Sequence, residues 1–328
     1  MESLIFAINA VMPIILMVLI GNVLKRIGLI SKDFIKTANK LVFRLFLPSM
    51  LFLNVYNIES FANVSIVYAI YALCITFVLF GIAIPIVIFS TKRGDRRGAM
   101  LQASFRSNYA LIGIPLAASL FGDEGTAVAC ILSAFSIPVF NVLAVISLSI
   151  FGSSGEKVKI SKIVLGIVKN PLIISVLSGC LCLLVREAFV GADIAFRLSD
   201  ITPVFKVLNY LSGVATPLAL IVLGAQFEFS AVPELKREII IATSLRVILS
   251  PLAGLGLALL LFPDFTGAHY AALTALFATP VAVSSVPMAQ EMGADTQLAG
   301  QLVVWTTVLS GFTIFIIAVI LKSMGIFV

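Results

Sequence analysis

Long apolar runs separated by short loops are the feature that most constrains how this chain can fold. A helix needs about 20 mostly apolar residues to cross the hydrocarbon core of a bilayer, and we count ten such runs in the 328 residues. They cover roughly residues 4–24, 35–55, 64–90, 100–121, 127–151, 162–185, 205–226, 239–262, 268–290 and 298–321. Only 12% of the residues are charged, about half the share typical of soluble domains. The sequence therefore predicts an all-α integral membrane protein of ten transmembrane helices, without a soluble domain.

Basic residues gather in alternate loops, which predicts the orientation of the helices. They follow the first, third, fifth and seventh runs, for example as Lys25-Arg26 and Lys236-Arg237, whereas the loops after the second, fourth and eighth runs carry none. The loop after the sixth run is the exception, with basic and acidic residues in balance. Because basic loops stay in the cytoplasm, we expect both termini on the outer, periplasmic side. Topology thus explains the net charge of +6 without nucleic acid as a partner.

Two of the runs carry prolines and polar residues that a membrane helix normally avoids. The first is Arg106-Ser-Asn-Tyr-Ala-Leu-Ile-Gly-Ile-Pro115, and the second is Ala278-Thr-Pro-Val-Ala-Val-Ser-Ser-Val-Pro287. Proline removes a backbone hydrogen bond and kinks or breaks a helix, and freed backbone groups are tolerated only inside protein or beside a wet cavity. We therefore expect helices 4 and 9 to be broken. The alternative is that these are only kinks that allow close packing.

The two halves of the chain carry similar features in the same order. Gly122-Asp-Glu-Gly-Thr126 follows the first break, and Gly293-Ala-Asp-Thr296 follows the second. Prolines at 48 and 217 occupy comparable depths in helices 2 and 7. We predict a first repeat over 1–151, a short cytoplasmic linker over 152–161, and a second repeat over 162–328. Since five helices per repeat is an odd number, the second copy is inverted, as in many secondary transporters.

These motifs resemble the auxin efflux carrier family, whose members include the PIN-like carriers of plants and shorter bacterial proteins. The likeness rests on Arg106–Pro115, on Phe140-Asn141, on Pro280-Val-Ala-Val-Ser-Ser285 and on Ala289-Gln-Glu291. It implies a scaffold part (helices 1, 2, 6 and 7), a transport part (helices 3–5 and 8–10), crossing broken helices, homodimers, an elevator-type motion and organic anion substrates. The chain lacks the long hydrophilic loop of the plant carriers, and it has Ser284-Ser285 where they have proline. We therefore do not expect auxin itself as the substrate.

The residues around the two breaks are the candidate substrate-binding residues. A half-helix that starts after a break presents free N–H groups and a positive dipole end, which bind carboxylates. Prolines 115 and 287 suit the first turn of such half-helices, and Gly113 permits close approach of backbone. The candidates with neutral polar side chains are Asn108, Tyr109, Asn141, Ser284 and Ser285. Pro280, in the second motif, is a further candidate substrate-binding residue. The resemblance implies ligand contacts at Asn108 and Asn141, whereas the alternative role of such groups is hydrogen bonding between helices.

Three charged residues within the runs are candidates for an electrostatic or coupling role, because charge inside a membrane is costly. Arg106 is expected either to attract an anion or to brace the break, and the role of Arg246 is open between structure and function. Glu291 closes helix 9, where it either carries a proton or cation or is solvated at the helix end. Lys40 and Arg44 lie near a helix end, from which their head groups can reach water.

The combined pattern predicts a secondary carrier of a small organic anion, a carboxylate by preference, in the bacterial inner membrane. A ligand-gated channel or a membrane sensor that uses the same site is the alternative. We do not expect an enzyme, because the sequence has no HExxH motif, nucleophile elbow or clustered carboxylate pair within a membrane run. No cofactor is expected, and the four cysteines fit apolar packing better than a metal site. The expected partners are the anion, the lipid bilayer and a second copy of the chain.

Overall fold

Helices account for every named element of the computed structural model, which describes residues 2–57, 66–151 and 168–327. These ranges contain no strand, and their one isolated β-bridge joins Ser107 to Val281. The expected linker 152–161 lies outside the described residues. The all-α prediction is confirmed for the described chain.

Six helical elements are long. Five of them are continuous, and the sixth, Ile114–Ile150, contains a kink at Phe121 and Gly122, where the backbone is not helical. The other elements are shorter pieces. The long ones are α1 (Glu2–Arg26), α4 (Ile66–Ser90), α6 (Ile114–Ile150), α8 (Pro171–Gly191), α9 (Thr202–Gln226) and α14 (Thr296–Ser323). The shorter pieces are α2 (Lys32–Leu41), η1 (Val42–Phe46), α3 (Leu47–Tyr56), α5 (Gly94–Phe105), η2 (Tyr109–Gly113), η3 (Leu198–Asp200), η4 (Phe229–Ala231), α10 (Val232–Ser244), η5 (Leu245–Leu249), η6 (Leu252–Gly256), α11 (Leu257–Leu261), α12 (Gly267–Ala278) and α13 (Ser285–Glu291).

The described helices have the length and the apolar surface of membrane-spanning segments. Seven helical stretches of the described chain are long and apolar enough to cross a bilayer: Lys32–Tyr56, Val67–Ser90, Tyr109–Ser133, Pro171–Gly191, Thr202–Gln226, Val232–Leu261 and Thr296–Ser323. Large apolar side chains such as Phe89, Leu181 and Leu260 are exposed on their outer faces, as expected for contact with lipid. The protein is an integral membrane protein, and its division into ten spans and two inverted repeats stays a prediction.

Three prolines are accommodated by a widened helical turn at the same spacing. The π-turns Val42–Phe46, Tyr109–Gly113 and Leu245–Leu249 each end two residues before a proline, at positions 48, 115 and 251. A proline ring crowds the carbonyl four residues earlier, and a π-turn displaces that carbonyl without ending the helix. The prediction that Pro115 lies in the first turn of a half-helix is wrong, because helical backbone begins at Tyr109 and Pro115 is its seventh residue.

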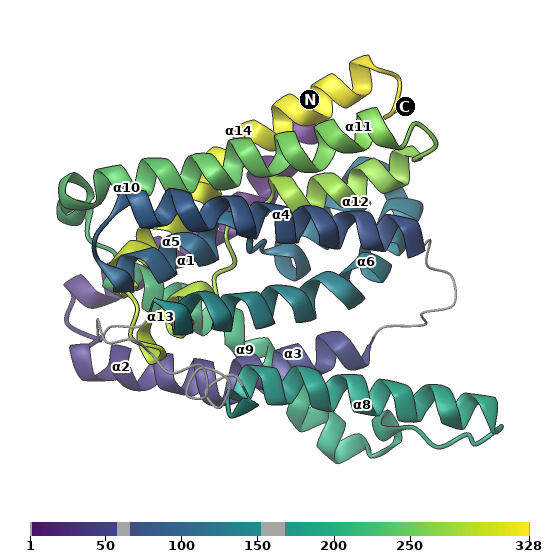
Figure 1. Ribbon diagram of the computed structural model, residues 1–328. Coiled ribbons are helices and arrows are strands. Elements are labelled where there is room, and N and C mark those ends of the chain that lie inside the picture. The colour runs from purple at the N-terminus through teal and green to yellow at the C-terminus, as the bar shows by residue number, and fades with distance from the viewer. Residues whose placement is uncertain (1, 58–65, 152–167, 328) are drawn as a thin grey trace.

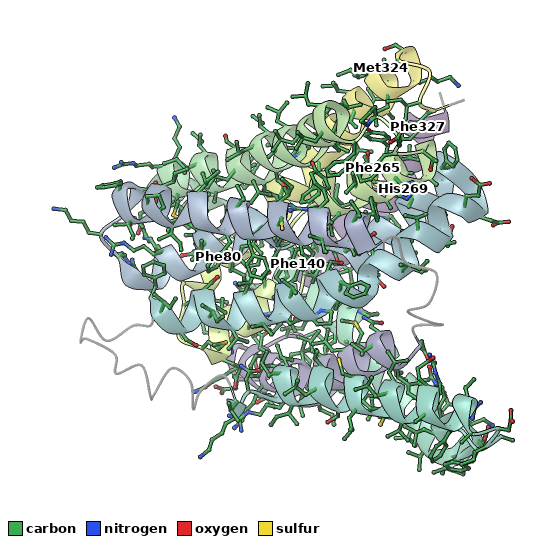
Figure 2. The ribbon with its side chains drawn as sticks, turned by 45° about the vertical axis from the view of Figure 1, so that its right-hand side comes forward. Phe80, Phe140, Phe265, His269, Met324 and Phe327 are labelled. Atoms are coloured by element: carbon green, nitrogen blue, oxygen red, sulfur yellow. The ribbon has the colours of Figure 1, made fainter. Side chains whose placement is uncertain are left out.

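The helices gather into two groups with the broken segments between them. Helices α2, α3, α8 and α9 lie together in the lower part of Figure 1, whereas α4, α10, α11, α12 and α14 lie in the upper part. At one end of the upper group the Phe265 ring stacks on His269 with ring centroids 5.2 Å apart, and both residues are labelled at that end in Figure 2. Tyr68 packs edge-on against the same His269 ring at 4.7 Å. Aromatic packing therefore ties α4 to the start of α12.

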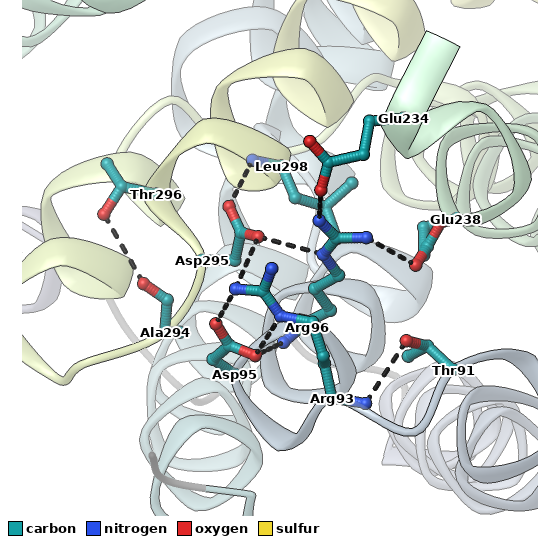
Figure 3. Close-up of polar contacts among 10 residues, drawn as sticks. All are labelled: Thr91, Arg93, Asp95, Arg96, Glu234, Glu238, Ala294, Asp295, Thr296 and Leu298. Atoms are coloured by element: carbon teal, nitrogen blue, oxygen red, sulfur yellow. Dashed lines mark hydrogen bonds and ion pairs between the residues drawn. The ribbon is translucent and has the colours of Figure 1, made fainter. Parts of the chain in front are cut away.

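An ion-pair network joins α5, α10 and the start of α14 at the opposite end of this group (Figure 3). The guanidinium of Arg96 pairs with Glu234, with Glu238 at 3.1 Å and with Asp295 at 3.2 Å. Arg96, Glu238 and Asp295 have side chains at most 10% exposed. Asp295 also accepts a hydrogen bond from the amide of Leu298 and so caps α14. Because a buried pair is strongly destabilised when one partner is removed, this network fixes the position of α5 before the chain reaches the first break.

Candidate functional site

The two breaks meet each other in the middle of the protein. Helix α5 ends at Phe105 and α12 ends at Ala278, and the residues that follow each of them are extended. The two extended segments run antiparallel, with a bridge between Ser107 and Val281 and a 2.8 Å hydrogen bond from the Asn108 amide to the Pro280 carbonyl. We refer to residues 106–108 and 279–284 together as the crossover.

The second break is longer than the sequence indicated. Helix α12 ends before Thr279, and the chain becomes helical again at Ser285, with Ser284 as the N-cap. The break does not lie at Pro287 itself, because Pro287 is the third residue of the new helix α13. That position is in the first turn, where the missing N–H of proline is harmless.

Arg246 is buried beneath the crossover and holds the ends of both broken helices. Its guanidinium donates to the carbonyls of Thr279 at 2.8 Å, Leu276 at 2.9 Å and Phe105 at 3.1 Å, and its side chain is fully buried. Carbonyls at a helix C-terminus lack partners within the helix and carry partial negative charge. Arg246 supplies both donors and positive charge to two such ends, so its role is to stabilise the crossover.

Arg106 occupies the other side of the crossover without a carboxylate partner. Its side chain donates to Asn141 Oδ1 at 2.9 Å, to Ser284 Oγ at 2.8 Å and to the Met288 sulfur at 2.6 Å. It is only 3% exposed, and it forms no ion pair with a carboxylate of the described residues. Asn141 in turn donates to the Ile137 carbonyl. Asn141 therefore positions Arg106 and does not line the cavity described next.

A cavity of about 170 Å³ lies between the crossover and helices α3 and α9. Its lining is formed by Leu47, Met50, Asn54, Asn108, Ala110, Leu111, Ala215, Thr216, Ala219, Val283 and Ser284. We call it the Asn108 pocket. Of the predicted residues, the structure brings Asn108 and Ser284 together here, with Arg106 hydrogen-bonded to Ser284 from behind.

Several hydrogen-bond donors at the Asn108 pocket have no acceptor within the described chain. The side-chain nitrogen of Asn108 is buried and unpaired. The amides of Tyr109, Ala110 and Leu111 open the long helical segment that continues into α6, and no acceptor is found for them among the described residues. For the buried Asn108 nitrogen, the lack of a partner costs about 1–3 kcal/mol. An anion in the pocket would satisfy several of these donors and balance the charge of Arg106.

Other predicted residues serve the backbone of the crossover and do not line the pocket. The hydroxyl of Tyr109 donates to the Ala129 carbonyl at 3.1 Å, so its side chain is turned into the core and does not line the Asn108 pocket. A Cβ on Gly113 would lie 3.0 Å from the Ala275 carbonyl, which is the close approach expected of this glycine. Ser285 and Pro287 are buried within the first turn of α13.

Asn54 and Thr216 are pocket residues that sequence reasoning missed. They come from α3 and α9 and face the crossover across the Asn108 pocket. Asn54 follows Pro48 in the second apolar run, and Thr216 directly precedes Pro217 in the seventh. The two prolines lie at comparable depth, and this was the one signal in the sequence that pointed to these parts of the two runs. A single sequence does not show whether a polar side chain lines a pocket or hydrogen-bonds to its own helix.

Glu291 lies in a second polar cluster, where α13 meets the lower group of helices. Its carboxylate is 3.6 Å from the Arg44 guanidinium, so Arg44 has a protein partner in addition to its access to water. The neighbouring Gln290 accepts from Asn39 at 2.5 Å and from Gln226 at 3.1 Å. We call these five residues the Gln290 cluster. It joins α13, beyond the crossover, to α2, η1 and α9.

Comparison with known proteins agrees with the membrane-spanning character of the described helices. Residues 6–318 match the family described as membrane transport protein. The chain belongs to this family. The match confirms the resemblance to the auxin efflux carriers, and it identifies the protein as a membrane transporter.

Two curated relatives are also named as transporters. An uncharacterized transporter of Methanothermobacter thermautotrophicus is 25% identical over 314 residues, which cover 92% of this chain and 94% of the relative. An uncharacterized transporter of Methanocaldococcus jannaschii is 26% identical over 248 residues, which cover 74% of this chain and 76% of the relative. The similarity therefore includes both sides of the crossover in the first relative, whose alignment spans nearly the whole chain.

Proposed function

We propose that this family member is a secondary carrier that binds a small organic anion, with a carboxylate as the expected class, at the Asn108 pocket. The observation that carries the proposal is the positive charge of Arg106 behind a pocket whose donors lack acceptors. A buried charge without a counter-ion is strongly unfavourable. A bound carboxylate would supply the missing negative charge and the missing acceptors at once.

The volume of the pocket limits the size of the polar part of the substrate. At roughly 30 Å³ per water molecule in the liquid, a cavity of about 170 Å³ has room for a carboxylate and a few further atoms. A more apolar cavity of about 580 Å³ shares Met50, Leu111 and Thr216 with it. We infer a substrate with a carboxylate at Asn108 and a short apolar body directed toward α1 and α9.

The arrangement of the helices supports alternating access. Two inverted repeats, with α1, α2, α3, α8 and α9 in a scaffold and the crossover in a moving part, would place the Asn108 pocket on the boundary between the two. Movement of the crossover past α3 and α9 would then change the access of the pocket from one side to the other. The donors at Asn108 and Ser284 are neutral, so the substrate can leave without separating a direct ion pair. By family resemblance we also propose a homodimer in the inner membrane with both termini outside.

The test is flux of radiolabelled carboxylates into proteoliposomes, with Asn108→Leu as the principal variant. Loss of the amide removes one donor to a charged ligand, worth about 1.5–3 kcal/mol, so we expect KM to rise roughly 10- to 150-fold. Asn209→Leu is the matched control, because Asn209 is an exposed α9 residue that binds only its own helix. Saturable flux that responds to Asn108 but not to Asn209 supports the carrier.

Two results would contradict the carrier and favour its rivals. Unitary currents through single proteins in a planar bilayer would indicate a channel. Binding of a carboxylate, seen as a thermal shift that Asn108→Leu abolishes, combined with no flux over the whole panel, would indicate a sensor.

A further inference from the structure

A further cavity shares no lining residue with the Asn108 pocket and opens to the lipid side of the protein. It is a groove of about 400 Å³ between α1, α9 and α14, and apolar side chains form most of its lining. Its outer rim includes Leu19, Val23 and Val308, all of them exposed. A protein surface of this kind within a membrane is covered by lipid unless another chain occupies it.

One wall of the groove is a tightly packed helix pair. A Cβ placed on Gly21 of α1 would lie 2.0 Å from the Ile221 carbonyl of α9, and one on Gly224 of α9 would lie 1.9 Å from the Val18 carbonyl of α1. Small residues at such contacts let membrane helices approach closely. The groove is therefore bounded by a fixed α1–α9 pair on one side and by α14 on the other.

A single basic residue marks one end of this apolar groove. Arg26 lies in the last turn of α1, lines the groove and is exposed, and it forms no ion pair or hydrogen bond with the described residues. The neighbouring Lys25 differs, because it is paired with Glu228 at 3.4 Å. The indole nitrogen of Trp305, on the α14 side, donates to Gln301. The groove thus has an apolar body and, at its mouth, a cation that has no partner within the described part of the chain.

The length of the groove matches one leaflet of a bilayer. Its α1 residues run from Ile15 to Arg26, which at 1.5 Å per residue is about 16 Å. Half of a hydrocarbon core about 30 Å thick is about 15 Å. An acyl chain that starts at Arg26 would therefore end near the midplane at Ile15.

We propose that this groove binds one phospholipid with an anionic headgroup. The headgroup phosphate pairs with Arg26, and one acyl chain lies along the groove between the α1–α9 pair and α14. Since α9 belongs to the lower group of helices and α14 to the upper group, the lipid touches both. A bound lipid would affect any movement of the lower group of helices against the upper group. This effect on movement rests on the proposed carrier function, whereas the binding of the lipid does not.

The experiment is native mass spectrometry of the full chain released from nanodiscs that contain equal amounts of phosphatidylglycerol and phosphatidylcholine. We expect one retained phosphatidylglycerol per chain in the wild type. Arg26→Ala removes the cation, and because one basic residue contributes about fivefold to anionic lipid binding, we expect retention to fall about fivefold. Val308→Phe adds bulk to the exposed rim and should lower retention without removing charge.

Lys32→Ala is the matched control, because Lys32 is an exposed basic residue six positions beyond Arg26 that does not line the groove. The proposal is overturned if Lys32→Ala lowers retention as much as Arg26→Ala. It is also overturned if the wild type retains the two lipids equally, which needs no variant to fold. A fall in dimer content with Val308→Phe, at unchanged lipid retention, would show that a second chain covers the groove instead. None of these readouts depends on transport, so failure of the carrier proposal would leave the lipid result intact.

Discussion

Replacing Arg246 with leucine should destabilise the protein, although Arg246 does not itself line the Asn108 pocket. The substitution leaves the carbonyls of Thr279, Leu276 and Phe105 without their donors at 2.8, 2.9 and 3.1 Å. Each buried carbonyl without a partner costs about 1–3 kcal/mol. Leucine also removes the cost of burying a guanidinium, which is several kcal/mol. This gain offsets part of the cost of the three unpaired carbonyls. We expect a net loss of about 3 kcal/mol, since removing a partner from a buried network is among the costliest single changes.

Thermal unfolding followed by the fluorescence of Trp305, the one tryptophan of the chain, measures this loss. At about 2 °C per kcal/mol for a chain of this size, Arg246→Leu should lower Tm by about 6 °C. Arg237→Leu is the control, because exposed Arg237 donates to a single carbonyl, that of Phe89, from α10, which continues into the η5 turn that carries Arg246. A Tm for Arg246→Leu within 1 °C of the Arg237→Leu value would refute the bracing role of this arginine.

Three further changes test other parts of the structure by the same Tm measurement. Arg96→Met leaves the buried Glu238 carboxylate unpaired and should cost about 3–5 kcal/mol, and a Tm equal to wild type would mean that the network is not formed. Tyr109→Phe loses only the hydrogen bond to Ala129, so we expect a cost of about 1 kcal/mol and unchanged carboxylate affinity; a large rise in Kd would instead place the hydroxyl in the pocket. Arg93 holds the pKa of the Asp95 carboxyl below its ordinary value, so the pair stabilises the fold above the unfolded-state pKa and loses that contribution as pH falls through the folded-state pKa. Asp95→Asn should remove this acid dependence of Tm at a cost below about 1 kcal/mol, and an unaltered Tm profile between pH 7 and pH 3 would contradict it.

The sequence was sufficient to predict which segments are helical and that two of them are interrupted. Apolar runs of membrane length have few alternatives to helix, because every backbone group must be paired within the bilayer. The location of the second interruption could also have been read more closely. A residue before proline is driven out of the helical region, and Thr279, which precedes Pro280, is extended with ψ 156°. Sequence reasoning used Pro280 as a helix breaker and as a candidate substrate-binding residue, and it drew nothing from the restriction that Pro280 places on Thr279.

The first interruption could not be placed in the same way, because no proline causes it. The chain leaves the helical conformation at Arg106, nine residues before Pro115. What holds it there comes from distant segments: the Pro280 carbonyl that pairs with Asn108 and the Arg246 guanidinium that binds the Phe105 carbonyl. Contacts between residues so far apart in sequence cannot be derived from one chain without an alignment.

The roles of the polar side chains, like the positions of the breaks, could be predicted only in part. Polar residue types at Asn108, Asn141 and Tyr109 predicted a polar centre, but their directions depend on helix rotation, which the sequence left open. The structure lines the pocket with Asn108, pairs Asn141 with Arg106 and turns Tyr109 away. Whether the lining residues bind a carboxylate stays a prediction.

The bridge between Ser107 and Val281 also sets how many residues the crossover can contain. Pro280 has no N–H, and helices begin again on both sides, so the pairing between the two extended segments is a single bridge that cannot lengthen or slip. One residue inserted between Phe105 and Tyr109 would shift the extended segment by one position, which reverses the side that its side chains face, and would carry Asn108 out of register with Pro280. Family members of very different sequence are therefore expected to share the length of this segment, and an alignment gap there would mark a protein with a different binding centre.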